Sequence, residues 1–281
     1  MKKQFKITDE EIKNLYLNGW SLSDIAKVAQ DTKGLMALRN RLHELGVNTN
    51  VSQRKYRYKI STSSRKYSFN EHYFDNIESE HQAYWLGFLM SDGYNHESKS
   101  QVSLRLHIQD IEILQKFKED LQYTGEISVI NRGNTQYCDL TLCSPIFSEA
   151  LTRLGCVQGK TYTLEFPKLQ DHLLNHFLRG YFDGDGCISI TQRSNRKEGS
   201  MQYQLNFVGK DSVILKIQDI ICKNTGVFKT KLRNRKNSFA NCISWCGRKV
   251  CFKILQYLYK DSTIYLNRKY NKYLQIGNAV E

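Results

Sequence analysis

The sequence predicts an α+β protein in which a small all-α unit precedes two pseudo-symmetric repeats, each ordered helix–strand–strand–helix–strand–strand–helix. Three observations support this fold class. The segment 84–93 recurs at 177–186, alternating apolar and polar residues follow each copy, and the first 48 residues have helical periodicity. With 40% hydrophobic residues among 281, the chain can fill a core, which excludes a wholly disordered protein.

The charge balance indicates a polyanionic partner. Lys and Arg number 41 against 28 Asp and Glu, which gives a formal net charge of +13. DNA, RNA and an anionic membrane surface all fit such a balance. No segment approaches the roughly 18 uncharged apolar residues of a membrane helix, and no apolar run follows the N-terminal lysines as in a signal peptide. We therefore expect a cytoplasmic protein of a bacterial or phage-infected cell, with an organelle as the alternative.

Cysteine and histidine spacing does not indicate a metal site of the zinc type. None of the 8 Cys forms a Cys-x-x-Cys pair, so we expect reduced cysteines. His172 and His176 have helical i,i+4 spacing, but the sequence offers no third ligand beside them, and we interpret both as structural.

Residues 1–48 are predicted to form a small helical module. Thr8 and Glu11 have the spacing of a capping box, and three short helices fit within 8–46. The third run places Leu38 and Leu42 inward and Arg39 and Arg41 outward. With the phrase Trp-Ser-Leu-Ser-Asp-Ile-Ala before the turn, the module resembles a helix-turn-helix DNA-binding unit, whose third helix would enter the major groove. The alternative is a generic three-helix bundle that packs on the main domain.

Residues 49–78 are predicted to be a basic linker. Between Val51 and Ser68 cations alternate with Tyr and Ser, and no apolar periodicity holds. Arg54, Lys55 and Arg57 are suited to tracking phosphates. The alternative is a solvated tether without specific contacts.

An internal duplication defines the two repeats, residues 79–165 and 166–281. The motif segments are related by a shift of 93 residues, and downstream positions such as Asp110 and Asp211 by a shift of 101. The eight extra residues of the second copy fall in the polar stretch 192–200. A hairpin loop between two strands would tolerate them there.

Each repeat opens with a helix that is apolar on nearly all sides and is therefore expected to be buried. Gly87 and Gly180 occupy matching places in the middle of these helices, at a cost of about 1 kcal/mol each relative to Ala. Close approach of another helix would explain both. We therefore predict that the two helices pack against each other through Gly87 and Gly180.

Asp92 and Asp185 follow at the ends of these helices. A carboxylate there faces the negative end of the helix dipole, and two packed helices would also bring the two charges together. A bound divalent cation reverses both unfavourable effects. An Asp-Gly turn that merely ends a helix explains one copy well but explains the duplicated pattern poorly.

Each helix is followed by strands with one apolar and one polar face. In the second repeat Tyr203, Leu205 and Phe207 alternate with amides. A concave antiparallel sheet with such a face fits duplex DNA, because Gln, Asn and Arg make bidentate contacts to purine edges and other cations contact phosphates. A membrane surface would need no amide-rich face. The predicted DNA-binding side chains on the strands are Arg105, His107, Gln202, Gln204, Asn206, Lys229, Lys231, Arg233 and Arg235.

The paired motifs and their downstream pattern resemble the LAGLIDADG homing endonucleases over residues 79–275. The resemblance implies saddle-shaped sheets, a central interface between the motif helices, and Mg²⁺ (or Mn²⁺) bound at their acidic ends. Metal-activated water would then attack one phosphodiester on each strand across the minor groove, leaving 3′ overhangs. The acidic residue before the last Gly of the motif is the metal ligand, which carries over to Asp92 and Asp185. A backbone oxygen at position 91 is left open as a further ligand.

The resemblance also implies polar or basic groups around the metal. Asp183 occupies the earlier acidic position of the motif, where the first repeat departs with Met90. Gln109 and Lys210 lie at matching strand ends. Further basic candidates for catalysis are Lys160 and Lys269, with Arg268 as the rival of Lys269. Each of these could instead anchor a phosphate or be a solvated surface group.

The sequence thus favours a monomeric, site-specific double-strand DNA endonuclease. The alternative is a non-cutting RNA-splicing maturase or DNA-binding regulator on the same scaffold, with intron RNA as a further partner. Retention of both acidic positions favours the nuclease, because a pure binder gains nothing from two carboxylates beside phosphates.

Overall fold

The computed structural model describes residues 7–17, 20, 22–29, 35–47, 66–157, 164–192, 201–234 and 240–278. The chain divides into two compact units, residues 1–67 and 68–281. Each unit has its own hydrophobic core, and the core of the second unit is shared by both repeats.

The first unit contains three helices, α1 (Asp9–Leu17), α2 (Leu22–Val28) and α3 (Leu35–Glu44). The capping box before α1 is present, because the backbone N of Glu11 donates to Oγ1 of Thr8 and the backbone N of Thr8 donates to Oε2 of Glu11. Ile12, Ile25 and Leu38 are fully buried between the helices. The helical periodicity of this region therefore corresponds to a packed three-helix unit.

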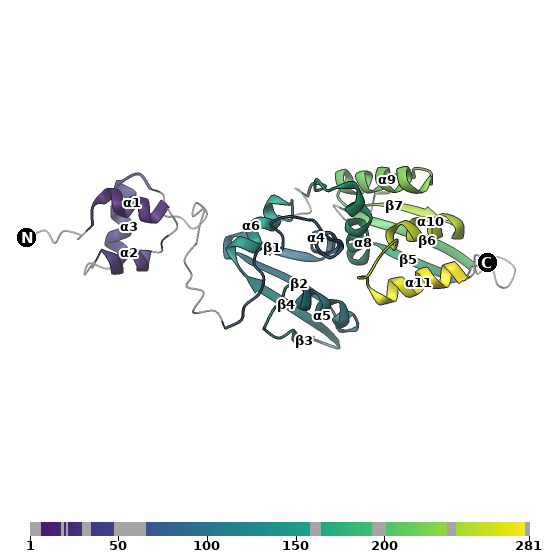
Figure 1. Cartoon of the computed structure of the whole chain (residues 1–281), viewed down its shortest axis with the longest axis horizontal. Helices are drawn as coiled ribbons and strands as arrows, with labels where there is room; N and C mark the ends of the chain where they lie inside the picture. Colours follow the sequence, from purple (N-terminus) through teal and green to yellow (C-terminus); the bar gives the residue numbers. More distant parts are fainter. Residues whose placement is uncertain are drawn as a thin grey trace, which may run out of the picture. The chain divides into compact units, whose positions relative to one another are not determined.

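The first repeat has the predicted order of elements. After the first motif helix and two strands, α5 leads into a second strand pair, and a last helix closes the repeat (Figure 1). The four strands form one antiparallel sheet in the order β1-β2-β4-β3. The elements are α4 (Glu80–Ser91), β1 (Gly93–His96), β2 (Gln101–His107), α5 (Ile111–Asp120), β3 (Ser128–Arg132), β4 (Thr135–Cys143) and α6 (Pro145–Arg153).

The second repeat follows the same course with three strands, in the order β5-β6-β7. The eight-residue insertion predicted from the duplication falls between β5 and β6 and lies outside the described residues. The elements are α8 (Leu174–Asp185), β5 (Cys187–Gln192), β6 (Met201–Gly209), α9 (Asp211–Thr225), β7 (Asn241–Cys246), α10 (Arg248–Leu258) and α11 (Asn267–Asn278).

One strand expected in the second repeat is not formed among the described residues. The segment 227–234 contributes a single bridge, between Arg233 and Cys242. Its carbonyls are taken by side chains instead, because Nε1 of Trp245 donates to the oxygen of Phe228 and Nε2 of Gln218 donates to that of Thr230. The alternation of residues 228–232 therefore did not correspond to a ladder, and Phe228 is 62% exposed rather than packed on an apolar face.

Two further features differ from the sequence-based expectation. Helix α11 follows the last predicted helix and was not anticipated. Residues 68–78, assigned by composition to the linker, pack with the first repeat: Phe74 is fully buried, and the backbone N of Asn70 donates to the oxygen of Leu121. The assigned range 49–78 therefore extended the linker too far, although the basic stretch itself ends at Ser68, where the second unit begins.

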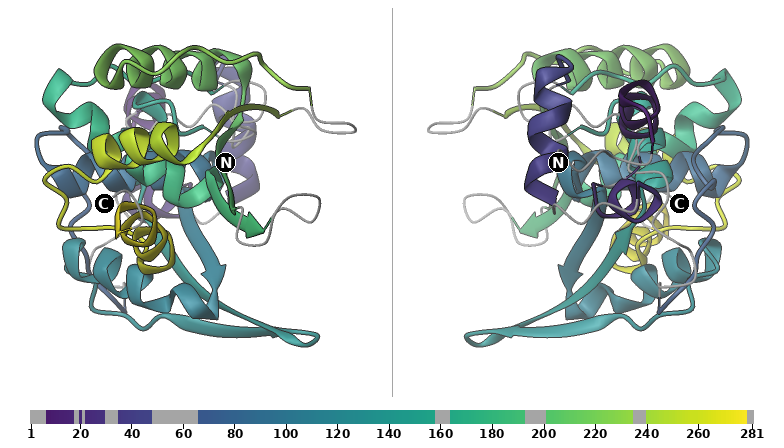
Figure 2. Two further views of the ribbon diagram at one scale, coloured as in Figure 1. Left: turned by 90° about the vertical axis from the view of Figure 1, so that its right-hand side faces the viewer. Right: turned by 90° about the vertical axis from the view of Figure 1, so that its left-hand side faces the viewer.

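The helices α4 and α8 lie side by side at the centre of the second unit, with one sheet on either side (Figure 1). Helices α5 and α6 cover the apolar face of the first sheet, and α9 and α10 that of the second. The β3–β4 hairpin extends past the helices that pack on its sheet (Figure 2). The other face of each sheet, which we call the open face, carries mainly exposed and half-buried residues among those that the structure describes.

A candidate metal centre and nucleic-acid interface

The structure places the two motif glycines where α4 and α8 cross. A Cβ atom at Gly87 would lie 2.1 Å from the backbone oxygen of Phe177, and one at Gly180 would lie 1.9 Å from that of Tyr84. Both contacts are with backbone, which cannot move aside as a flexible side chain can. The absence of a side chain at these two positions therefore permits the helices to approach this closely.

Asp92 and Asp185 come to the same end of this helix pair. Asp92 is the C-cap residue of α4, Asp185 is the last residue of α8, and both are exposed. A Cβ atom built on Gly184 would lie 3.3 Å from Oδ2 of Asp92, so this carboxylate rests against the final turn of α8, next to Asp185. The helix crossing thus brings together two acids that are far apart in the sequence.

A buried tyrosine lies within the field of both carboxylates. Tyr181 donates its hydroxyl to the backbone oxygen of Val208 at 3.1 Å. Burial raises the pKa of Tyr181 most, and the charges of Asp185 and Asp92 raise it further. Because both charges act on one hydroxyl, they share one electrostatic environment, where a cation would be favourable.

The donor set fits a hard divalent cation. The two exposed carboxylates supply oxygen ligands, which Mg²⁺ prefers. No cluster of three or more His, Cys, Asp or Glu side chains occurs among the residues that the structure describes. A site with two protein carboxylates suits an ion that retains several waters and completes its shell with substrate phosphate oxygens. It does not suit a closed structural zinc site.

Lys269 closes the end of α8 from the side of α11. Its side chain is buried, and Nζ donates to the backbone oxygens of Asp183 at 2.8 Å and Gly186 at 2.6 Å, as well as to that of Phe182. Burial lowers the pKa of Lys269 to about 8, although Asp183 and Asp92 act in the opposite direction. The negative end of a helix dipole is unfavourable for the two acids, and an ammonium at that end offsets it.

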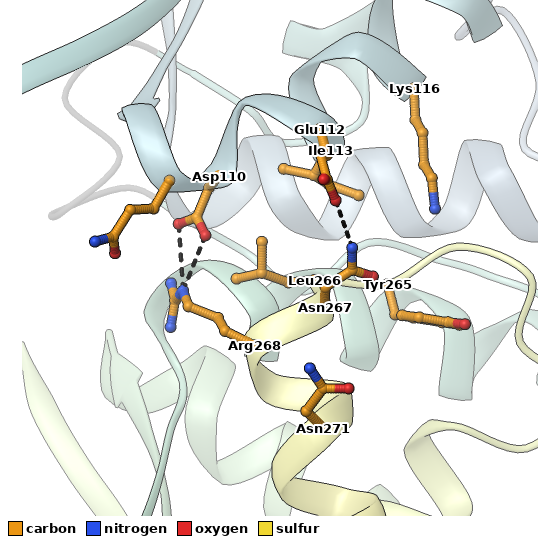
Figure 3. A pocket seen from close by; sticks show the side chains of 10 residues that line it. Asp110, Glu112, Ile113, Lys116, Tyr265, Leu266, Asn267, Arg268 and Asn271 are labelled. Atoms are coloured by element: carbon orange, nitrogen blue, oxygen red, sulfur yellow. Dashed lines mark hydrogen bonds and ion pairs between the residues drawn. The ribbon is translucent and has the colours of Figure 1, made fainter.

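Two other predicted catalytic side chains, Gln109 and Lys210, follow matching strands. Lys210 comes directly after β6 and is half-buried, whereas Gln109 lies in the 3-10 turn 108–110 that follows β2 and is exposed. Lys160 lies outside the described residues. Arg268 is engaged with Asp110, because its Nε donates to Oδ1 of Asp110 at 3.1 Å beside a pocket of about 230 Å³ (Figure 3).

The open face of the second sheet is rich in amides and hydroxyls. Gln202, Gln204 and Asn206 share this face of β6, while Leu205 and Phe207 are buried on the other. Nε2 of Gln204 donates to Oγ of Ser244 on β7 at 2.7 Å. The side-chain oxygen of Asn206 is buried and accepts no hydrogen bond from a described residue. The face therefore presents hydrogen-bonding capacity suited to base edges.

The open face of the first sheet carries charge. Arg105 is exposed on β2, and its Nε donates to Oδ1 of Asp139 on β4 at 2.8 Å. His107 is exposed near Tyr137, with the rings nearly perpendicular. The pairing of Arg105 with Asp139 orients the guanidinium across the strands and leaves its two terminal nitrogens outside this hydrogen bond.

Not every predicted cation lies on these faces. Lys229 forms an ion pair with Asp219 of α9, the helix on the apolar side of the second sheet, so the expectation that it shares the open face is wrong. Lys231 is exposed and lies outside any strand. Arg233 lies opposite Cys242 and therefore shares with it the open face of the second sheet, since Ile243 and Trp245 take the apolar face. Arg235 and the linker cations Arg54, Lys55 and Arg57 lie outside the described residues.

In the first unit the two cations of α3 differ. Arg39 is exposed. Arg41 donates from Nε to Oδ1 of Asp9 at 2.9 Å and also pairs with Glu44, so it joins α3 to α1. Arg39 is therefore the more available of the two for an external anion.

Sequence reasoning missed a buried polar network between the repeats. Arg179, fully buried in α8, donates to Oε1 of Glu80 at 2.7 Å and to the backbone oxygens of Leu258 and Ile264. Its Nη1 also lies 2.9 Å from Nδ1 of His176, which bears a structural role rather than a metal-binding one. An arginine inside an otherwise apolar helix was the available signal, since such a charge is buried only when paired.

No helix within the described part of the chain could span a membrane.

One family model matches part of this chain. Residues 178–280 match the family described as LAGLIDADG endonuclease. Over 154 residues the chain is 25% identical to the reverse gyrase of Methanocaldococcus jannaschii. The matched stretch is 54% of this chain and 9% of the reverse gyrase, so the chain spans only a small part of that protein.

Similar solved structures include two homing endonucleases with DNA. The I-LtrWI LAGLIDADG homing endonuclease bound to target DNA is 12% identical, with 75% of this chain and 91% of that chain covered and a TM-score of 0.47. The LAGLIDADG meganuclease I-AabMI bound to uncleaved DNA is 11% identical, with 70% and 90% covered and a TM-score of 0.49.

The family match confirms the resemblance seen in the duplicated motif: residues 178–280 are similar to the LAGLIDADG endonuclease family, and residues 84–93 repeat the segment 177–186 with which that match begins.

Proposed function

We propose that this protein is a site-specific double-strand DNA endonuclease that hydrolyses one phosphodiester on each strand across the minor groove. One observation carries the proposal: the carboxylate of Asp92 rests against the last turn of α8, beside Asp185, at the exposed end of a glycine-packed helix pair. Two acids held together there are unfavourable for stability alone and favourable for holding a cation near phosphate.

Asp92 and Asp185 would hold Mg²⁺ or Mn²⁺. When bound, such an ion supplies an activated water and offsets charge on the leaving oxygen. The role of the two aspartates is to keep their oxygens at a fixed place relative to the open faces of both sheets. The rigid helix crossing provides that placement, because neither helix can shift without breaking backbone contacts at Gly87 and Gly180.

Other residues would bind and orient the duplex. Gln109 and Lys210, which follow matching strands, would contact phosphates, and Lys160 is proposed for the same role. Gln202, Gln204 and Asn206 on one sheet and Arg105 and His107 on the other would read base edges. An amide-rich face and a charged face would then meet different halves of one target, which fits a single chain that recognises an asymmetric site.

We also propose that the first unit extends the DNA contact. Three helices with an exposed Arg39 on the third suit a helix-turn-helix module, and the basic linker with Arg54, Lys55 and Arg57 suits a segment that follows phosphates. The enzyme would act as a monomer, since one chain supplies both acids.

Cleavage of a randomised duplex library tests the proposal. Purified protein with Mg²⁺ or Mn²⁺ should release fragments whose mapped ends share one site and carry 3′ overhangs. The double variant Asp92→Asn, Asp185→Asn should release none while still binding the selected site. Intact DNA in every divalent metal, together with RNA that outcompetes duplex DNA, would instead support a maturase on this scaffold.

A further inference from the structure

Asp183, the earlier acidic residue of the second motif, is directed away from the proposed metal site. Its side chain is fully buried, and Oδ2 accepts hydrogen bonds from the backbone N of Leu266 and from the hydroxyl of Tyr84, at 2.8 and 2.9 Å. The hydroxyl of Tyr259 lies 3.4 Å from Oδ1. Asp183 therefore binds the segment that leads into α11, and a tyrosine of the other motif helix.

Helix α11 returns the contact to α8. Lys269, in its first turn, donates to the backbone oxygens of Phe182, Asp183 and Gly186, which flank Asp185. These hydrogen bonds, together with that from Leu266 to Asp183, join the start of α11 to the last turn of α8 in both directions. We refer to Asp183, Leu266 and Lys269 with these carbonyls as the α8–α11 clamp.

The start of α11 is also held by the first repeat. Arg268 pairs with Asp110, and Nδ2 of Asn267 donates to Oε2 of Glu112 at 2.6 Å (Figure 3). The clamp is therefore anchored from two sides, so the place of α11 is determined by both repeats. A lysine on such a fixed helix can determine where the end of α8 lies.

The first repeat has a different residue at the position of Asp183. Met90 is buried there, and its Cε lies near the backbone at Gly155. A thioether cannot accept the strong hydrogen bonds that a carboxylate accepts, so this position in α4 is held by apolar packing alone. Asp92 and Asp185 thus lie at the ends of helices that are supported by different interactions.

We propose that Asp183 is a positioning residue for the second active site, acting through the α8–α11 clamp on Asp185 more than on Asp92. This inference rests on the proposed nuclease function. It assigns a role to a motif position that holds no metal, and it predicts that the two strand cuts respond differently when the clamp is broken.

Three variants separate the contributions. Asp183→Leu removes both acceptors and keeps the branching and the number of side-chain heavy atoms. Asp183→Asn can place its amide oxygen at the position of Oδ2, keeping the hydrogen bonds from Leu266 and Tyr84, and can direct its NH₂ toward the hydroxyl of Tyr259. Met90→Leu is the matched control in the first repeat, a volume-conserving change at the equivalent site.

The first readout is the rate of each strand cut on a plasmid that carries the selected target. Asp185→Asn identifies the strand that depends most on Asp185. Asp183→Leu should slow that cut on the order of 100-fold relative to the other, because a displacement of about 1 Å has such an effect, and nicked circles should accumulate. Asp183→Asn should recover most of the lost rate, and Met90→Leu should leave the ratio of the two rates unchanged.

The second readout needs neither metal nor activity. In the full-length protein without DNA, amide hydrogen exchange at Leu266 and Gly186 should quicken at least about tenfold in Asp183→Leu, and at Gly186 in Lys269→Met, which breaks the other arm. Unchanged exchange, or equal slowing of both strands, overturns the proposal. If Asp183→Leu does not fold, Lys269→Met and Asp183→Asn decide the question. If the unaltered protein cuts no DNA, the nuclease proposal fails and exchange alone judges the clamp.

Discussion

Two carboxylates at the end of α4 and α8 carry the proposed chemistry, and their removal gives the first prediction. Asp92→Asn or Asp185→Asn should abolish at least one strand cut, because a cation loses a charged ligand. DNA binding should be equal or tighter, since a negative charge beside phosphates is lost. End-labelled duplex reports each cut, and fluorescence anisotropy reports affinity.

Asp171→Asn is the matched control for this pair. Asp171 is exposed before the N-terminal end of α8. Its replacement changes the net charge equally without touching the C-terminal ends of α4 and α8, where Asp92 and Asp185 lie. It should leave both cuts intact. Loss of cleavage in Asp171→Asn, or weaker binding in the Asp92 and Asp185 variants, would contradict a direct role for the two acids.

A second prediction at the residue scale concerns acid stability. Burial first, and then the charge of Arg179, lower the pKa of His176 from 6.5 to about 4. The unfolded chain therefore binds more protons below pH 6.5, so the stabilising effect of neutral His176 is present above pH 6.5 and is lost as the pH falls toward 4. Chemical denaturation of the unaltered protein should show this decrease in the free energy of unfolding.

His176→Asn isolates the effect, because an amide oxygen can replace Nδ1 as a neighbour for Arg179 without titrating. The difference between the two proteins removes the opposite contribution of His81, whose pKa the hydrogen bond with Asp120 raises. The variant should lose less stability between pH 6.5 and 4. Parallel curves would show that His176 does not titrate on unfolding.

At the residue scale, the positions that could be predicted from the sequence are those that recur in both repeats. Gly87, Gly180, Asp92 and Asp185 stood out because each breaks a local rule at a matching place. Asp183 could not be interpreted in the same way, since its partners Leu266 and Tyr259 lie more than 70 residues away and are joined to it only by folding. The same holds for Lys269, whose carbonyl partners are invisible in a sequence.

At the scale of elements, the glycine crossing gives a prediction about stability. Gly87→Ala and Gly180→Ala each place a Cβ about 2 Å from a backbone oxygen of the facing helix, so α4 and α8 must separate. We expect each to lower the free energy of unfolding by about 3 kcal/mol or more, beyond the usual range for overpacking by side chains, as measured by denaturant titration.

Gly277→Ala, in α11, serves as the control. Its added Cβ would meet ring atoms of Phe252, the nearest at 3.1 Å, and Ala is favoured over Gly within a helix. This variant should be close to neutral. Similar stability of all three variants would show that the helices can separate at little cost.

Elements were predictable where one periodicity dominated. The strands of the first repeat and the helices α5 and α9 follow their alternation or helical stripe closely. The segment 227–232 also alternates, yet Trp245 and Gln218 bind its carbonyls in place of a neighbouring strand. Alternation shows which face a residue takes but does not show whether a partner strand is available.

At the scale of the whole molecule, the chain consists of two units, each with its own hydrophobic core, and a basic stretch connects them in the sequence. Composition located this stretch, because apolar periodicity fails there. The basic stretch ends at Ser68, where the second unit begins, but the assigned linker ran on to residue 78, and only the fold shows that Phe74 is buried. The net charge of +13 attracts a polyanion to the protein as a whole, and the distribution of the cations decides the affinity for it.

The linker cations provide the last prediction. Replacing Arg54, Lys55 and Arg57 by Ala should weaken binding to target and non-target duplexes alike, because phosphate contacts are independent of sequence. If all three contact phosphates, the slope of log affinity against log salt should fall by about 2.7, at 0.9 for each contact. Anisotropy titrations over a range of salt concentrations measure it.

A control with the same loss of charge distinguishes contact from net charge. Lys249, Lys253 and Lys260 are exposed on α10 or just after it, and α10 packs on the face of the second sheet opposite the amides. Replacing these three by Ala should leave the slope almost unchanged, because counterions are released only where phosphates are contacted. Equal slopes in the two triple variants would mean that the linker acts as a solvated tether without phosphate contacts.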